Sequence, residues 1–240
     1  MPKRKATGDD KSQETRDTAS KQSGELINNL NALSANDFQQ QYLKPARLAP
    51  PTTEALEGPQ VEISFKASGD LTKDELSQCL NLIASTSRQH YESSGWGWHP
   101  RRKTREMKEA EMRYLLVRST VSTAPSGSEP VEEADIEGFL SFMLTHDSSP
   151  PVPVLYVYEV HLVPRLRKLG LGAHLMRVVE EVAKDAGVEK VMLTCFVCNE
   201  RARKFYESRG YGKDVISPED RRTRAKIVKA DYVIMSREAA

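Results

Sequence analysis

Hydrophobic residues recur at two different spacings between residues 61 and 240. Segment 61–67 alternates apolar and polar residues with a period of two, which predicts a strand. Residues 71–95 carry apolar residues at helical spacing. Thr72, with Glu75 three residues later, forms a capping-box pattern that predicts where this helix begins. Apolar segments rich in β-branched and aromatic residues predict further strands at 112–119, 136–147, 154–163, 189–197 and 231–238.

The clearest helical pattern in the chain lies between residues 170 and 186. Its apolar residues fall on one face and most of its charged residues on the other, and Gly187 is a stop signal. A shorter helix is predicted over 200–210, where Asn199 can cap its first turn. Together these elements predict a mixed α/β domain of about seven strands with a few helices, much of its sheet connected by hairpins.

The first sixty residues have a different pattern. Residues 1–23 lack aromatic and β-branched aliphatic residues, so we expect a disordered polar tail. Residues 24–60 begin with apolar residues at the spacing of a short amphipathic helix and continue into a proline-rich stretch, and we expect this segment to pack on the domain. The remaining residues, 61–240, form the predicted domain.

Composition narrows the class of protein without naming a partner. Hydrophobic residues make up 38% of the chain and the net charge is +1, so electrostatic arguments must be local. The three cysteines suit a reducing compartment, and no apolar run reaches the length of a membrane span. We therefore expect a protein of the cytoplasm and nucleus, with PKRK at residues 2–5 as a possible import patch.

Cys195 and Cys198 form a lone C-x-x-C pattern. A zinc site needs a second pair of cysteines or histidines at ligand spacing, which the sequence lacks, so we predict no metal site. A redox pair is one interpretation. The other is the end of a strand that carries one buried thiol.

The turn before the long helix combines basic residues with glycines and reads RLRKLGLG over 165–172. A helix N-terminus bares backbone N–H groups, and glycines let a ligand approach them, so the turn is suited to an anion such as a pyrophosphate. The spacing fits neither G-x-x-x-x-G-K-[ST] nor G-x-G-x-x-G. It matches R/Q-x-x-G-x-G/A at Arg167, Gly170 and Gly172, which resembles the pyrophosphate loop of the GNAT superfamily of acetyl-CoA-dependent N-acetyltransferases.

Four further segments resemble the NatD family of histone N-terminal acetyltransferases. They read YESSGWGW (91–98), LYVYEVHL (155–162), KVMLT (190–194) and DYVIMSR (231–237). The resemblance spans 61–237 and implies the GNAT acyl-CoA N-acyltransferase fold with acetyl-CoA as co-substrate. It also implies transfer of acetyl, by direct attack in a ternary complex, to the α-amine of core histones that begin Ser-Gly-Arg-Gly, those of the four and two-A types.

Glu159 is the first candidate for catalysis. A carboxylate is out of place in the apolar strand 154–163, which indicates a pocket, although an exposed-face glutamate of an alternating strand is the alternative. By the resemblance Glu159 removes the proton that the attacking amine loses. Strand alternation puts Tyr156 and Tyr158 on the opposite face from Glu159. The superfamily resemblance implies a bulge here, and a bulge would bring all three side chains to one site.

The resemblance also assigns roles to other residues. Tyr206 would lie near the leaving thiolate as a general acid, and Asp147 would hold the arginine of the histone terminus. Each role has a simpler alternative: a turn for Asp147, core packing for the aromatic residues, strand propensity for Thr194 and helix capping for Asn199. The expected catalytic residues are Glu159 and Tyr158. The expected cofactor-binding residues are His161, Leu162, Val163, Arg167, Lys168, Leu169, Gly170, Leu171, Gly172, Asn199 and Tyr206. The expected substrate-binding residues are Tyr91, Trp96, Asp147, Tyr156, Tyr158, Thr194 and Tyr232.

Two alternatives to this function stay open. One is an acetyltransferase that acts on a lysine side chain or a small amine. The other is a non-catalytic module that binds acetyl-CoA or histone tails. The expected partners are histone N-terminal peptides and acetyl-CoA, with ribosome association as a possibility. We expect no membrane and no direct nucleic-acid partner, because the basic stretch 221–229 lacks interleaved aromatic residues.

Overall fold

A seven-stranded mixed sheet organises the chain in the computed structural model, which describes residues 9–51, 60–120, 134–148, 151–222 and 227–239. The sheet has the order β1-β2-β3-β4-β5-β9-β6, and of its neighbouring pairs only β4 and β5 run parallel. Its strands are β1 (Val61–Ala67), β2 (Arg113–Ser119), β3 (Ile136–His146), β4 (Pro153–Leu162), β5 (Lys190–Phe196), β6 (Gly212–Lys213) and β9 (Tyr232–Glu238). These strands confirm the mixed α/β architecture expected from the hydrophobic pattern.

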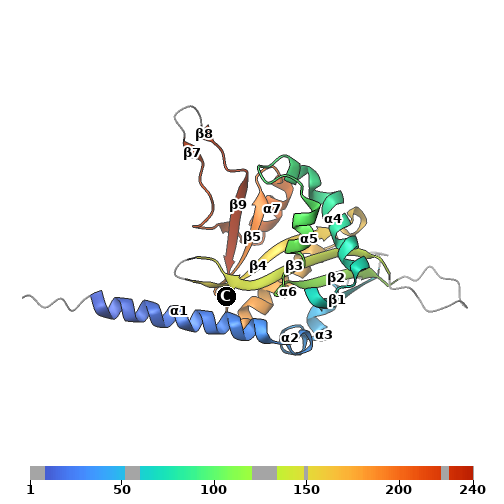
Figure 1. The fold of residues 1–240 in the computed structure, drawn as a ribbon. Helices are drawn as coiled ribbons and strands as arrows, with labels where there is room; N and C mark the ends of the chain where they lie inside the picture. The colour runs from blue at the N-terminus through green and yellow to red at the C-terminus, as the bar shows by residue number, and fades with distance from the viewer. Residues whose placement is uncertain (1–8, 52–59, 121–133, 149–150, 223–226, 240) are drawn as a thin grey trace, which may run out of the picture.

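Helices cover both faces of the sheet (Figure 1). One face carries α4 (Lys73–Glu92) and α5 (Pro100–Glu106), which enclose a cluster of buried side chains around Cys79 and Tyr114. The larger core lies on the other face, under α6 and the N-terminal helices. Those helices are α1 (Asp9–Ala32), α2 (Ala35–Tyr42), α3 (Pro45–Leu48) and α6 (Leu171–Ala186), and α7 (Glu200–Glu207) packs on β5.

Local sequence signals account for the ends of the main helices. Thr72 Oγ1 accepts from the Glu75 amide while the Glu75 carboxylate accepts from the Thr72 amide, so the predicted capping box begins α4. Gly170 and Gly187 flank α6, both in the left-handed region at φ 78° and 71°. Asn199 caps α7 by accepting from the Ala202 amide at 3.1 Å. All four of these helix ends were predicted, and the structure confirms them.

The N-terminal helix is longer than expected. We expected a disordered tail over 1–23, whereas α1 begins at Asp9 and ends at Ala32. The segment from Asp9 to Ser23 contains no proline or glycine, and two acidic residues stand in its first turn, where they favour a helix start. Disorder was predicted because this segment lacks apolar residues. A segment can nevertheless have a high helix propensity without apolar residues.

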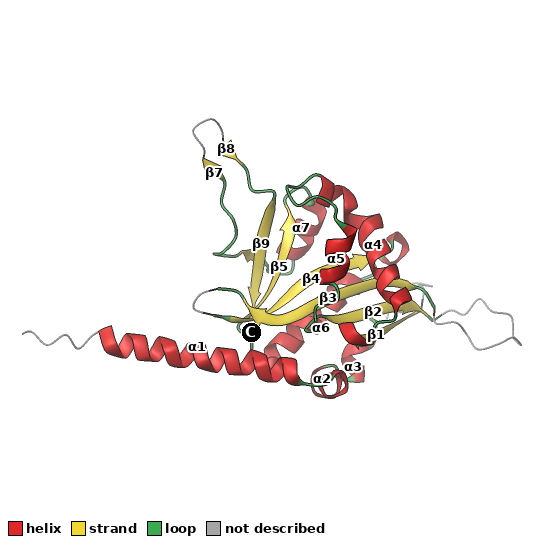
Figure 2. Cartoon of the chain, viewed as in Figure 1, coloured by secondary structure: helices red, strands yellow, loops and turns green. Residues whose placement is uncertain are grey.

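The chain then turns at Ser34, whose side chain caps α2. The short helix α5 was not expected either. Pro100 in its first turn was the available signal, because proline is favoured at a helix start. Two further short strands, β7 (Arg221–Arg222) and β8 (Ile227–Val228), pair with each other outside the main sheet, and in Figure 2 this pair projects away from the body.

The pairing between β4 and β5 ends halfway along β4. Their parallel pairing runs from Val154↔Lys190 to Val157↔Leu193, whereas β4 continues to pair with β3 as far as Leu162. Figure 1 shows β5 and β9 turning away from β3 and β4. A V-shaped opening between two strands is the place where a ligand can reach backbone groups inside a sheet.

The predicted bulge lies at the start of this opening. Ser141 pairs with Glu159 and Phe142 with Val157, so Tyr158 is the extra residue of β4. The bulge reverses the alternation at this point. Tyr156, Tyr158 and Glu159 consequently line one pocket, which simple alternation forbids.

Phe38 secures the N-terminal segment to the sheet. Its ring is fully buried, lies 5.6 Å from Phe65 and 6.3 Å from Phe142, and receives the guanidinium of Arg113 at 4.5 Å from its centroid. We expect Phe38→Ala to lower the free energy of unfolding by about 3–5 kcal/mol, because a large buried ring leaves a cavity. Chemical denaturation measures the change, with exposed Gln40→Ala as control. A loss below about 1 kcal/mol would show that α2 does not anchor the segment.

Candidate active site

A pocket of about 340 Å³ opens at the bulge of β4, and we call it the Glu159 pocket. Its walls come from the end of α4, from α5, from β4 and β5, and from α7. Most of the side chains expected to bind substrate line it. They are Tyr91, Trp96, Tyr156, Tyr158 and Thr194, and Glu159, expected as a catalytic residue, lines the pocket too.

Glu159 lies at the centre of a hydrogen-bond network and is only 7% exposed. Its Oε1 accepts from the Tyr91 hydroxyl at 2.9 Å and from Lys103 Nζ at 2.8 Å, and its Oε2 lies 2.6 Å from His161 Nε2. Burial raises the pKa of this carboxyl, but the Lys103 ammonium and the His161 ring outweigh burial and lower it to about 2. Glu159 is therefore ionised at neutral pH in spite of its burial.

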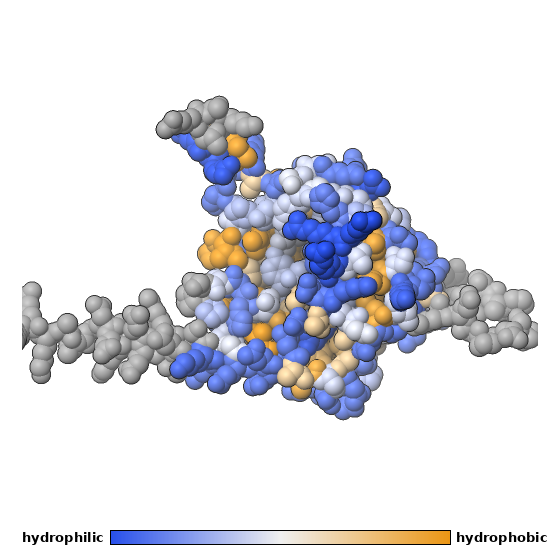
Figure 3. Space-filling view, in the orientation of Figure 1, coloured by the Kyte–Doolittle hydropathy of each residue, from blue (hydrophilic) through white to orange (hydrophobic). Residues whose placement is uncertain are grey.

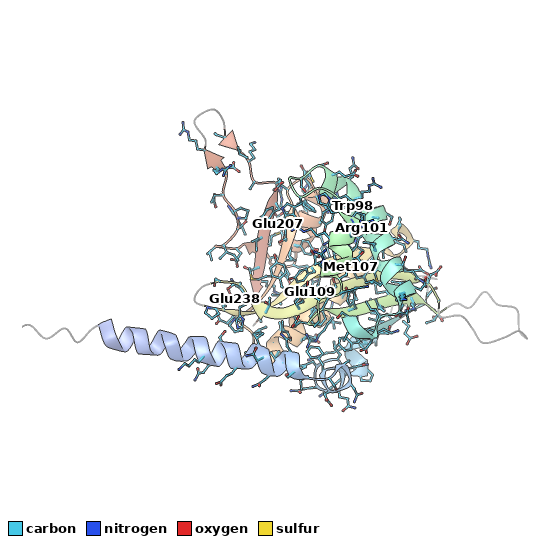
Figure 4. The ribbon with its side chains drawn as sticks, viewed as in Figure 1. Trp98, Arg101, Met107, Glu109, Glu207 and Glu238 are labelled. Atoms are coloured by element: carbon cyan, nitrogen blue, oxygen red, sulfur yellow. The ribbon has the colours of Figure 1, made fainter. Side chains whose placement is uncertain are left out.

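Lys103 reaches Glu159 from α5, which the sequence did not predict. The residue is only 8% exposed, and its ammonium also lies 2.5 Å from Glu106 Oε1. Burial disfavours the charge, but Glu159 outweighs burial and raises the pKa of Lys103. Figure 4 shows the segment that carries it, from Trp98 through Arg101 to Met107, beside α4. Lys103 stands in a run of basic residues, HPRRK, and nothing in the sequence distinguishes it from its neighbours.

Aromatic rings surround the mouth of the Glu159 pocket. Trp96 is 42% exposed, and its ring lies 5.7 Å from Phe196 and 5.0 Å from Tyr232. Asp231 helps to hold Trp96 there, because its carboxylate accepts from the Gly95 amide. Tyr232 itself lines a neighbouring depression and reaches this pocket through its contact with Trp96.

The tyrosines of β4 line the wall deeper in. The Tyr156 hydroxyl lies 2.5 Å from Thr194 Oγ1, and the rings of Tyr156 and Tyr158 are 5.3 Å apart. Burial raises the pKa of both phenols, so they are neutral donors at physiological pH. The wall is therefore aromatic with hydroxyl groups, and it carries no charge of its own.

A second and larger hollow of about 800 Å³ adjoins the Glu159 pocket, and we call it the Gly170 groove. It runs from the opening between β4 and β5 to the first turn of α6. Val160, His161, Asn199, Ala202 and Tyr206 line both hollows, so the two are continuous. Leu162, Arg167, Lys168, Gly170 and Gly172 line the groove alone.

The backbone of the Gly170 groove suits an anion. Gly170 caps α6 without a side-chain hydrogen bond, so the amides of the first turn of this sixteen-residue helix keep no capping partner. Lys168 adopts a left-handed conformation, φ 65°, unusual for a residue with a side chain. Arg167 Nε donates to the Leu162 carbonyl at 2.8 Å, which ties the turn to β4. The arrangement can hold a phosphate group by backbone N–H groups with basic side chains beside them.

Tyr206 lies where the two hollows meet. Burial is the first cause that raises the pKa of its phenol, followed by the nearby Cys195 and Glu159. The hydroxyl therefore keeps its proton at neutral pH and can donate a hydrogen bond where the two hollows meet. The general-acid role expected for Tyr206 stays a prediction.

Some of the expected site residues do not line either hollow. Leu171 is buried in the larger core, and Val163 and Leu169 lie outside the hollows too. Asp147 was expected to bind substrate. Its carboxylate instead pairs with Lys190 at 2.7 Å and accepts from Ser148. Lys190 also pairs with Asp214 at 2.8 Å, so Asp147 belongs to a buried network at the other end of β4. The turn interpretation of Asp147 fits this position better.

The two cysteines of the C-x-x-C pattern are free thiols. Cys195 is buried, and burial raises the pKa of its thiol to about 11, so it is a poor nucleophile at neutral pH. This favours the interpretation as a strand end over a redox pair.

Within the described residues, no group of three or more His, Cys, Asp or Glu is placed to hold a metal ion. No helix in the same part of the chain is long and apolar enough to cross a membrane.

The chain belongs to the acetyltransferase (GNAT) family, whose profile matches residues 90–211, a little over half of its length. The matched region contains most of the lining of both hollows and the two strands, β4 and β5, that separate beside them. The fold and the two hollows are thus those of the GNAT class of acetyltransferases, in which acetyl-CoA is the co-substrate.

Comparison with individual proteins gives one partial sequence match and two similar structures. A stretch of 96 residues is 34% identical to N-alpha-acetyltransferase 40 of Saccharomyces cerevisiae, and the match spans 33% of this chain and 34% of that protein. The fold is similar to Arabidopsis thaliana NAA60 in complex with a bisubstrate analogue, with a TM-score of 0.50 and 12% identity over 73% of this chain and 98% of the other. The fold is also similar to smu.2055 from Streptococcus mutans, with a TM-score of 0.51 and 15% identity over 75% of this chain and 99% of the other. These two structures support the fold.

We expect Gly170→Asp to weaken acetyl-CoA binding by about 10-fold or more, because a side chain at φ 78° strains the turn and its negative charge repels a phosphate. Isothermal titration calorimetry measures the dissociation constant. Gly187→Asp is the matched control, because Gly187 has φ 71° and equally open space but lies at the other end of α6. Equal affinities of the two variants would exclude the first turn of α6 from the binding site.

Proposed function

We propose that this protein transfers acetyl from acetyl-CoA to the α-amine of peptides that begin Ser-Gly-Arg-Gly, the N-terminus of core histones of the four and two-A types. The observation that carries the proposal is an ionised, buried Glu159 at the end of an aromatic-walled pocket that opens into the Gly170 groove. The similarity to N-alpha-acetyltransferase 40 supports an α-amine acceptor.

The groove is the proposed place for the cofactor. Its pyrophosphate would meet the backbone of residues 167–172. Its pantetheine arm would extend along β4 after Val157, where pairing with β5 has ended. The thioester would then point toward Glu159, because the groove and the pocket share Val160 and His161. This arrangement puts donor and acceptor together in one ternary complex, so no acyl-enzyme is needed.

The chemistry of the acceptor suits the pocket. An α-ammonium has a pKa near 8, so an appreciable fraction is already neutral at physiological pH. The attacking nitrogen must still lose a proton, and an ionised carboxylate close to it can accept one. The Lys103 ammonium also opposes a second positive charge in the pocket, which favours the neutral amine over the ammonium.

The size of the Glu159 pocket favours an acceptor peptide with a small first residue. Tyr91, Tyr156, Tyr158 and Trp96 border a pocket of about 340 Å³, which is narrow for a peptide with a large side chain at its first position. The arginine of the acceptor needs an acidic partner. Glu106 is the other carboxylate among the described residues that line the pocket, and it is the proposed partner in place of Asp147. A lysine acceptor would need a stronger base, since its pKa is near 10.4.

Two synthetic peptides test the acceptor. One begins with a free Ser-Gly-Arg-Gly-Lys, and the other is identical but has a blocked N-terminus. With labelled acetyl-CoA we expect label on the free peptide alone, because the lysine of both peptides stays protonated. Label on both peptides would move the acceptor to lysine. Label on neither, with cofactor binding shown by calorimetry, would favour another acceptor or a binding module.

Glu159→Gln tests the base. We expect turnover to fall by about 10²–10⁴-fold, because the amide cannot accept the proton, while the dissociation constant for acetyl-CoA changes by less than about twofold. Glu106→Gln removes the other carboxylate of the same pocket. It should raise the KM for the peptide and lower turnover by less than about 10-fold. Wild-type turnover in Glu159→Gln would remove Glu159 from the mechanism.

A further inference from the structure

His161 occupies an unusual position between the two hollows. Its ring is 7% exposed and lines both the Glu159 pocket and the Gly170 groove. Nε2 lies 2.6 Å from Glu159 Oε2, and Nδ1 lies 2.6 Å from Thr86 Oγ1 on α4. Both ring nitrogens are thus hydrogen-bonded, and they join a group of the pocket to a group of the groove.

Glu159 alone is poorly suited to keep a proton. Oε1 already accepts hydrogen bonds from Tyr91 and Lys103, and Oε2 lies 2.6 Å from His161 Nε2. The pKa of this carboxyl is lowered to about 2, so a proton that arrives on it from an amine leaves again readily. The natural next acceptor is the imidazole, because its Nε2 lies 2.6 Å from Glu159 Oε2.

We propose that His161 is the second member of an acid–base pair with Glu159, and that it passes the substrate proton through the Thr86 hydroxyl to the Gly170 groove. The inference rests on the proposed function only for the identity of the acceptor amine. Thr86 suits the relay because its hydroxyl lies 2.6 Å from Nδ1 and the residue lines the Gly170 groove, where solvent can take the proton that it passes on.

The step balances with the two substrates and the solvent. The amine nitrogen bonds to the acetyl carbonyl carbon as the carbon–sulfur bond breaks. The nitrogen loses one proton to the Glu159–His161 pair, and the leaving thiolate gains one from the Tyr206 hydroxyl or from water. With the ring in the tautomer that carries its proton on Nδ1, Glu159 passes the substrate proton to Nε2 while Nδ1 gives its own proton to the Thr86 hydroxyl, which passes one to solvent in the groove. Tyr206, where it has donated, is reprotonated from the same solvent. No oxidant or further reactant is needed.

Several titratable groups border the pair. From α4 come Tyr91, which donates to Glu159, and His90, which lies one helical turn after Thr86 and lines the groove. From α5 comes Lys103, whose ammonium balances the Glu159 charge. From α7 comes Tyr206, which lines both hollows, and from β3 the neutral ring of Phe139 lies 5.5 Å from His161. The Lys103 ammonium is already protonated and is held by Glu159. The His161 ring is therefore the neighbour of Glu159 to which we assign the substrate proton.

His161→Gln separates this role from a purely structural one. Glutamine can still donate to Glu159 but does not titrate. We expect its turnover to fall by about 10–100-fold. In a plot of log(kcat/KM) against pH, we expect the acidic side to have a slope of one for His161→Gln. We expect a slope of two for the wild type, in which both the amine and the Glu159–His161 pair must be deprotonated. The dissociation constant for acetyl-CoA should stay within about twofold, because the groove keeps its backbone. Equal turnover and an equal slope in both proteins would overturn the proposal.

Thr86 provides a second test that does not depend on how His161→Gln folds. Thr86→Val keeps the shape of the side chain and removes the hydroxyl, so we expect turnover to fall by about 5–10-fold, and Thr86→Ser should restore it. Equal turnover in the valine and serine variants would exclude the relay. If the wild type prefers another acceptor amine, the proposed histone function fails, and the same profiles measured with that amine still decide the role of His161.

Discussion

Burial of one carboxylate is the constraint on which the rest of the site depends. An unpaired charge in a protein interior costs several kcal/mol, and Glu159 avoids that cost because three side chains from three elements converge on it. Tyr91 comes from the end of α4, Lys103 from α5 and His161 from the same strand. The ion pair thereby fixes the positions of two helices relative to the sheet, and the polar network that serves the reaction also specifies the geometry of the pocket.

The bulge in β4 is the second requirement. If β4 alternated strictly, with no bulge at Tyr158, Glu159 would face the side of the sheet opposite to Tyr156, and no single pocket could contain both. The bulge coincides with the point where β5 separates from β4. The surface around this point differs on its two sides in Figure 3: strongly hydrophilic residues gather over α5, and hydrophobic residues lie toward β9. A peptide terminus that enters here meets charge on one wall and aromatic rings on the other.

Local patterns predicted most of the secondary structure, and the reason is visible in particular residues. The capping box at Thr72, the glycines around α6 and the cap at Asn199 act within one helical turn, so the sequence shows them directly. Periodicity alone could not predict the bulge at Tyr158, which came from a family resemblance. Lys103 was missed because its role depends on a contact 56 residues away. The ion pair between Asp147 and Lys190 was missed for the same reason, since it joins residues far apart in the sequence.

The division of the sheet also affects how it holds together. β1 to β4 form one hydrogen-bonded unit and β5, β9 and β6 another, and the ladder between the two spans only the residues from Val154 to Val157. Helix α6, which packs on β3, β4 and β5, spans the same junction. Cooperativity between the two halves therefore passes through a short ladder and one helix. The amides of the β5–β9 half can open for hydrogen exchange as a sub-global unit, at a lower free energy than the β1–β4 half.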